Sequence, residues 1–174
     1  MSPRRLLVSV LFAVLMLVIY SPWPVDSSRV APKQSEENVT KTFLDDAEMI
    51  AAMADAQVSK AAFLRALAAP KPNQTGFSAK HPFSTTKGDG QREHIWISQL
   101  TYDGTLLHGI VSNDPLYVSH LKIDDSVSFH PMELTDWMYF EDGKVVGGYT
   151  IRVLRTRMNA EDGAEFDRQM QFKP

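Results

Sequence analysis

The sequence predicts an α+β domain in which helices flank an antiparallel sheet of about five or six short strands. Apolar residues recur every three or four positions between residues 43 and 69, which is typical of a helix. From Thr75 onward, short runs rich in β-branched and aromatic residues alternate with turn signals, as in hairpins. Helical signals return after Gly147-Gly148, and helices at both ends of a hairpin series indicate α+β rather than a parallel sheet.

Residues 43–69 are expected to form one helix or a helix pair. Asp45 or Asp46 can cap the start, because a carboxylate accepts hydrogen bonds from the free N–H groups of the first turn. Ser59 can cap a second segment, and Pro70 ends the helical region. The apolar positions are Met49, Ala52, Met53 and Ala56 in the first segment and Ala62, Phe63, Leu64 and Leu67 in the second.

The central region is expected to form strands joined by tight turns. Asp103-Gly104 and Asp142-Gly143 are hairpin signals, because Asp and Gly both tolerate positive φ. The expected strands are Phe77–Phe83, Glu93–Tyr102, Thr105–Val111, Ser126–His130, Trp137–Glu141 and Lys144–Gly147.

The C-terminal part is expected to be helical. Gly147-Gly148 allow a sharp change of direction, after which Tyr149–Met158 fits both a helix and a strand. Arginines near the end of this segment favour the helix, since cations stabilise a helix C-terminus. Asn159 can cap a last helix, on which Phe166 and Met170 share a face.

An aromatic run in the fifth expected strand is the densest local feature of the chain. On a strand, Trp137 and Tyr139 point to one face, and Met138 and Phe140 point to the other. One pair is expected to face the core, whereas the other forms a binding surface or lies under a helix. The candidate binding residues are Trp96, Asp136, Trp137, Tyr139, Gly147 and Gly148.

The first residues carry the pattern of an export segment. Arg4-Arg5 precedes an apolar block, residues 6–20, that is interrupted only by Ser9. A helix of this length rises about 22 Å, short of the roughly 30 Å hydrocarbon core, which favours a cleaved signal peptide. A poor cleavage site at Val25-Asp-Ser27 favours a retained anchor. Residues 1–27 therefore predict export to the cell envelope, with the domain either released or tethered.

Composition sets further bounds. Residues 28–42 are polar and aperiodic, as in a flexible linker, and residues 43–174 suffice for a single domain with its own core. The absence of cysteine excludes disulfides, thiolate chemistry, cysteine zinc sites and an N-terminal lipid anchor. A net charge of −3 and scattered lysines and arginines argue against nucleic acid as a partner.

No catalytic, metal-binding or cofactor motif emerges from the sequence. The five histidines lack the spacing of metal ligands, and neither a Gly-x-Ser-x-Gly elbow nor a phosphate loop is present. No catalytic residue, metal or cofactor is therefore assigned. His94 and His108 lie on the two arms of the first expected hairpin, so a hydrolytic site joining either to Asp103 or Asp114 is an alternative.

Several motifs together indicate a family. The most specific are Asp136-Trp-Met-Tyr139 and Gly143-Lys-Val-Val-Gly-Gly-Tyr-Thr-Ile-Arg152, with further matches at Glu93-His-Ile-Trp-Ile-Ser98 and Asn113-Asp-Pro-Leu-Tyr117. Through these motifs, the domain resembles the YegJ-like family of bacterial domains of unknown function. The resemblance implies a bacterial source and a compact α+β domain, and it carries no activity with it.

These observations favour a non-enzymatic binding or interaction module in the cell envelope. Its partners would be a protein and, if the N-terminal segment is not cleaved, a membrane. The alternatives are an envelope hydrolase that uses His94 or His108 with a carboxylate, and an immunity-type protein that neutralises a toxin.

Overall fold

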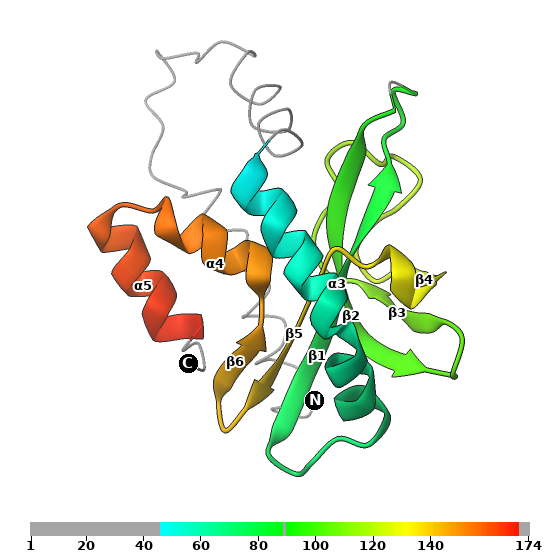
Figure 1. Cartoon of the computed structure of the whole chain (residues 1–174). Helices are drawn as coiled ribbons and strands as arrows, with labels where there is room; N and C mark the ends of the chain where they lie inside the picture. Colours follow the sequence, from blue (N-terminus) through cyan, green and yellow to red (C-terminus); the bar gives the residue numbers. More distant parts are fainter. Residues whose placement is uncertain (1–45, 89, 171–174) are drawn as a thin grey trace, which may run out of the picture.

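The computed structural model of the protein describes residues 46–88 and 90–170 and has an α+β fold, which confirms the predicted class (Figure 1). A long helix precedes the strands, and two shorter helices follow them. The elements are α3 (Ala47–Ala68), β1 (Gln74–Ser84), β2 (Arg92–Tyr102), β3 (Leu107–Val111), β4 (Ser126–Phe129), the 3-10 helix η1 (Pro131–Glu133), β5 (Asp136–Glu141), β6 (Lys144–Gly147), α4 (Tyr149–Thr156) and α5 (Ala160–Met170).

The six strands form one antiparallel sheet in the order β4-β3-β2-β1-β5-β6. β5 returns to pair with β1, so the sheet joins segments that are far apart in the sequence. Successive residues of β5 alternate between the two faces, and each face has its own core. α3 packs on the first face, and α4 and α5 pack on the second.

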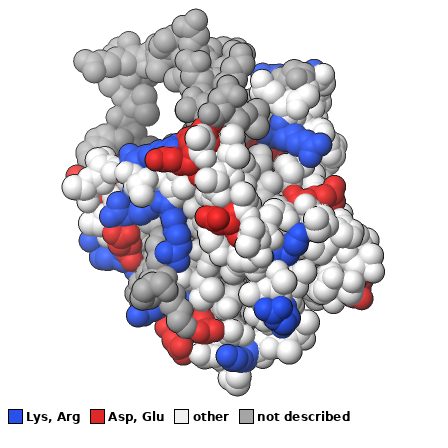
Figure 2. Space-filling model, viewed as in Figure 1, with Lys and Arg blue, Asp and Glu red and all other residues white. Residues whose placement is uncertain are grey.

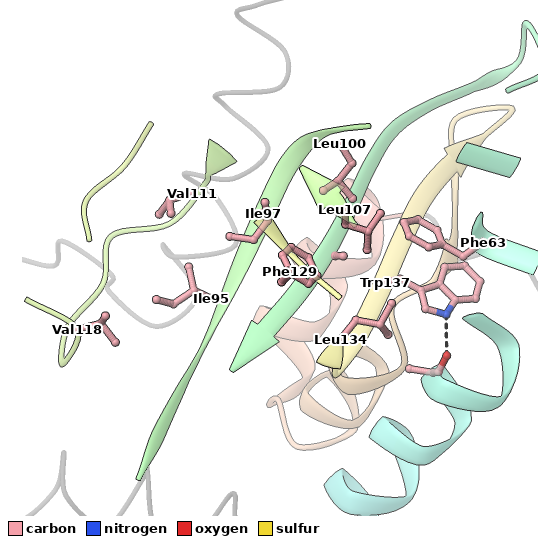
Figure 3. Packing of buried hydrophobic residues seen from close by; sticks show 12 residues of the cluster. Phe63, Ile95, Ile97, Leu100, Leu107, Val111, Val118, Phe129, Leu134 and Trp137 are labelled. Atoms are coloured by element: carbon pink, nitrogen blue, oxygen red, sulfur yellow. Dashed lines mark hydrogen bonds between the residues drawn. The ribbon is translucent and has the colours of Figure 1, made fainter. Parts of the chain in front are cut away.

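The first core lies between α3 and the sheet (Figure 3). The Trp137 indole N–H donates to the Ala56 carbonyl oxygen at 3.0 Å, and its ring centre lies 5.1 Å from that of Phe63. Phe63 and Ala56 are fully buried. These contacts fix α3 over β5, and the core continues across the sheet through Ala79, Ile95, Ile97, Leu107 and Val111.

The second core lies under α4 and α5. Trp96 and Met138 project from the sheet on this side and meet Ile151 of α4. Phe166 and Met170 of α5 complete the cluster, as their predicted shared face requires. The structure therefore covers both faces of β5, because helices distant in the sequence pack on each side.

α3 is one continuous helix of 22 residues and not a helix pair. The Asp46 carboxylate caps it by accepting hydrogen bonds from the N–H groups of Glu48 and Met49. The predicted second cap at Ser59 is wrong: its hydroxyl donates to the Asp55 carbonyl oxygen at 2.7 Å, within an unbroken helix. A serine inside a helix can bond back to the preceding turn, so its presence alone does not mark a boundary.

The two hairpin signals have different outcomes. Asp142-Gly143 forms the expected two-residue turn, with positive φ at both residues and Glu141 paired with Lys144. The β2–β3 connection is longer than expected, and β3 begins at Leu107 rather than at Thr105. The Asp103 carboxylate accepts the Thr105 and Leu106 N–H groups, so these residues belong to the turn.

The C-terminal helices follow the prediction, with α4 over Tyr149–Thr156 and Asn159 capping α5 through the N–H groups of Glu161 and Asp162. Among the helices within the described ranges, none is both long and apolar enough to cross a membrane. The predicted export segment and linker, residues 1–42, lie outside the described residues.

Candidate functional site

A buried carboxylate ties β5 to the start of α4. Asp136 has no exposed surface, and it accepts hydrogen bonds from the backbone N–H groups of Trp137 at 2.8 Å, Tyr149 at 3.0 Å and Thr150 at 2.8 Å. The Thr150 hydroxyl adds a fourth hydrogen bond at 2.5 Å. Since α4 begins at Tyr149, Asp136 satisfies N–H groups that lack a partner within the helix.

A lysine completes this buried polar cluster. The Lys80 ammonium donates to the Thr150 hydroxyl at 2.7 Å and lies 4.8 Å from the centre of the Trp96 ring. Burial lowers the pKa of Lys80, whereas the charge of Asp136 acts in the opposite direction. Burial raises the pKa of Asp136, and Lys80 and the hydrogen bonds from Thr150 and Trp137 oppose this shift. Every charge in the cluster therefore has a partner.

The double glycine makes this cluster possible. Gly147 and Gly148 have φ values of 80° and 67°, which favour glycine. A Cβ on Gly147 would lie 2.3 Å from the Trp137 carbonyl oxygen, so no larger residue fits without movement. The chain thus turns sharply between β6 and α4, which aims the first N–H groups of α4 at Asp136.

The six residues predicted to bind a ligand are placed inside the domain. Trp96 and Trp137 are 4% and 3% exposed, and Tyr139 stacks on Phe77 in the first core. Asp136, Gly147 and Gly148 are also buried. Of the two alternatives for these rings, the structure shows burial for Trp96 and Trp137, and Tyr139 is half-buried against the first core. Strand alternation identified which rings share a face, but it does not show that helices cover both faces.

His94 faces the interior near the buried cluster. Its Nδ1 lies 2.9 Å from the Thr135 hydroxyl, and no carboxylate of the described residues bonds to it. Burial, aided by the positive charge of Lys80, lowers the pKa of His94 to about 4. A neutral ring enclosed in this way is not placed to exchange protons with a substrate.

His108 lies in an exposed polar chain at the other end of the sheet. Its Nε2 is 2.9 Å from the Asp103 carboxylate, and its Nδ1 is 2.7 Å from the Ser128 hydroxyl. The hydrogen bond from His108 lowers the pKa of Asp103 to about 2, with help from two backbone N–H groups. The predicted contact between His108 and Asp103 is present. His94 lies elsewhere: in the sheet register His108 is opposite Thr101, which is seven residues along β2 from His94.

An open hollow of about 440 Å³ lies between α3 and the turn that contains η1. We call it the α3–η1 hollow, and it is lined by Met53, Ala54, Gln57, Arg92, Met132, Glu133, Leu134 and Thr135. The Gln57 amide donates to the carbonyl oxygens of Met132 and Leu134, which holds the turn against α3. Met132 is 64% exposed at the rim.

The hollow carries more free positive than negative charge. The Arg92 side chain forms no hydrogen bond or ion pair with the other described residues. Lys60, beside the hollow, donates to Gln57 and to the Met132 sulfur, which are both neutral. Glu133 is the one acid of the lining: it accepts the His130 N–H at 3.0 Å and lies 3.8 Å from Nε2 of His81, whose pKa is lowered by burial.

The comparisons with known proteins agree with the predicted resemblance. Residues 46–173 match a family described as "Uncharacterized protein conserved in bacteria (DUF2314)". The chain belongs to this family. It is 30% identical to the "Uncharacterized protein YegJ" of Escherichia coli K12 over 55% of the chain and 60% of that protein. It is 33% identical to a "Putative ankyrin repeat protein" of Neisseria meningitidis over 51% of the chain and 35% of that protein.

The chain thus spans about a third and three fifths of these relatives. No solved structure matches it. The motifs that carry the family resemblance, around Asp136 and Gly147-Gly148, coincide with the buried cap of α4, so these residues have a structural role.

The family resemblance did not point to the hollow, and sequence analysis missed Gln57, Arg92 and Met132. These residues meet only through tertiary packing of α3, β2 and η1. One sequence signal was present: apolar residues occur on all sides of α3, including Ile50 and Val58, which are 48% and 85% exposed. A helix with a fully solvated outer face usually carries polar residues there.

Proposed function

We propose that the chain is a non-enzymatic binding module of the bacterial cell envelope and that a partner protein docks in the α3–η1 hollow. The observation that carries this proposal is the combination of Met53 and the exposed Met132 with Arg92, whose charge is uncompensated among the described residues. Methionine and arginine are enriched at protein interfaces, and flexible thioethers adapt to a partner surface.

The surface around the hollow supports docking. Ile50 lies one turn before Ala54 on the flank of α3 that borders the hollow, so the apolar surface continues along the helix. Figure 2 shows mostly uncharged side chains across the face that carries α3, with isolated charged groups among them. Such a surface favours contact with a protein over contact with nucleic acid.

The envelope part of the proposal rests on the sequence. Residues 1–27 have the charge and apolar pattern of an export segment, so the domain would be released after cleavage or tethered through residues 6–20. Toxin neutralisation, the immunity-type alternative, is one form of the proposed protein binding.

One relative adds support for protein binding. It is named for ankyrin repeats, which stack into extended binding surfaces. The match covers only 35% of that protein, so the matching part would be one module beside other binding units.

Site-specific crosslinking tests the proposal. A photoreactive amino acid replaces Met132 in the full chain, in cells of the source bacterium, and a matched variant carries it at the exposed Lys144 of β6. We expect a discrete protein adduct from position 132 in the envelope fraction and none from position 144. The purified partner should then bind the unmodified chain saturably. The absence of an adduct at position 132, or the same adduct at both positions, contradicts the proposal.

A hydrolase is the second candidate function, because the structure joins Ser128, His108 and Asp103 in one hydrogen-bonded chain. His108 could accept the Ser128 hydroxyl proton as the oxygen attacks an ester carbonyl and pass it to the departing alcohol, while Asp103 stabilises the imidazolium. Water would then hydrolyse the acyl group from Ser128 and release the acid. The geometry favours binding over hydrolysis, since His108 and Asp103 are 41% and 52% exposed on an open surface.

A fluorophosphonate probe tests this alternative, because it labels activated serines. Labelling of Ser128 that His108→Gln abolishes would support a hydrolase. An unlabelled chain, or labelling that does not depend on His108, removes this alternative.

A further inference from the structure

The α3–η1 hollow also indicates the chemistry of its partner. We infer that it binds an extended segment of a partner protein in which an acidic residue and an apolar residue lie two positions apart, with the carboxylate on Arg92 and the apolar side chain against Met53 and Met132. This inference rests on the proposed binding function and specifies its ligand.

Charge is the first argument. Arg92 and Lys60 form no ion pair with the other described residues, and they face a single acid in the hollow, Glu133, which accepts the His130 N–H, so the cations outnumber the carboxylates. The charge available to a partner is therefore positive, although the whole chain is acidic, with a net charge of −3. A guanidinium presents paired N–H donors that match the two oxygens of a carboxylate.

Apolar surface is the second argument. Met132 is 64% exposed and lines the hollow with Met53 and Ala54, and Ile50, one helical turn before Ala54, is 48% exposed. No residue of the edge strands β4 and β6 lines the hollow, so side chains and not an added strand would provide the recognition. Apolar side chains of a partner would remove these residues from water.

Shape is the third argument. The hollow is open rather than enclosed, and along α3 the flank from Ile50 to Gln57 rises about 10 Å. About three residues of an extended chain cover that length, so an acidic residue and an apolar residue two positions apart point to the same side. An open strip of this kind suits a peptide better than a small metabolite, which normally lies in a deeper pocket.

Fluorescence anisotropy with synthetic peptides tests the inference on the full chain, purified in a nonionic detergent. The probe is a fluorescein-labelled peptide that repeats Glu-Ser-Leu-Ser, so that glutamate and leucine lie two positions apart, and two control peptides replace the glutamates by lysine or the leucines by serine. We expect saturable binding of the glutamate–leucine peptide and at least tenfold weaker binding of both controls.

Matched variants locate the site. Arg92→Glu should weaken binding of the glutamate–leucine peptide at least tenfold and Met132→Ser about fivefold, whereas Arg65→Glu, on the exposed side of α3, should change it less than twofold. Circular dichroism of each variant confirms that the fold is kept.

Three results would overturn the inference. The first is that the glutamate–leucine peptide shows no saturable binding. The second is binding that ignores charge, seen either as equal binding of the lysine–leucine peptide or as unchanged binding to the Arg92→Glu variant. The third is binding to phosphatidylglycerol vesicles that depends on Arg92 without peptide binding, which assigns the hollow to a membrane. Crosslinking at position 132 can still capture a partner, and the Arg92→Glu variant can bind that partner normally. In that case the proposed function stands and only the inferred ligand class fails.

Discussion

Removal of the Asp136 carboxylate is expected to destabilise the domain more than any surface substitution. Asp136→Ala leaves the N–H groups of Trp137 and Thr150 buried without an acceptor, and it leaves Lys80 without its nearby negative charge. Each buried donor without a partner costs about 1–3 kcal/mol, and a lost helix cap costs about 1 kcal/mol. The expected loss is therefore about 3–5 kcal/mol, which is comparable to breaking a buried charge pair.

Urea unfolding followed by tryptophan fluorescence measures this loss. Small domains are stable by about 5–15 kcal/mol, so a loss of this size is a large share of the total. Asp136→Asn serves as the milder variant, with an expected loss of about 2 kcal/mol. Asp114→Ala is the matched control, since Asp114 is exposed and should change stability by less than about 0.5 kcal/mol. A loss below 1 kcal/mol for Asp136→Ala would refute the reasoning that this cap locks α4 to the sheet.

Two further predictions concern backbone strain and pH. Gly147→Ala should lower the free energy of unfolding by about 3 kcal/mol or more, because its Cβ meets the Trp137 carbonyl oxygen at 2.3 Å. Gly143 has a similar φ but open space around it, so Gly143→Ala should lower it by about 1 kcal/mol in the same assay. Stability should fall by about 2 kcal/mol between pH 7.5 and pH 5, because the unfolded chain protonates His94 near pH 6.5 but the folded chain only near pH 4. Burial lowers the pKa of His81 too, which adds to this loss, so His94→Gln should reduce the pH dependence, and an unchanged dependence would show that His94 is not its source.

Local chemistry explains what the sequence could predict. The Asp142-Gly143 turn, the Asn159 cap and the change of direction at Gly147-Gly148 each depend on the conformational preferences of one or two residues. These preferences act wherever the residues occur, so they can be recognised without a structure. The α+β class follows from their order along the chain.

Tertiary packing explains what the sequence could not predict. Period-two alternation placed Trp137 and Met138 on opposite faces, but only the positions of α3 and α4 show that both are buried. Ser59 has the chemistry of a helix cap, yet its hydroxyl bonds back to the Asp55 carbonyl oxygen, and α3 runs unbroken through it to Phe63, which packs on Trp137. The candidate binding hollow joins positions 57, 92 and 132, whose proximity no local pattern encodes.

The structure separates the residues on which the family resemblance rests from those that we propose to bind. Asp136 and Gly147-Gly148 belong to the most specific of the motifs that carry the resemblance, and all of them serve the buried connection between β5 and α4. A substitution there would weaken binding by disturbing the fold, whatever the ligand. Arg92 and Met132 contribute little to the cores, so their substitution can change binding while the fold is kept. A substitution that abolishes binding therefore reports on ligand recognition only when it lies at an exposed position such as these two. For this reason the decisive variants are placed in the hollow and not in the motif.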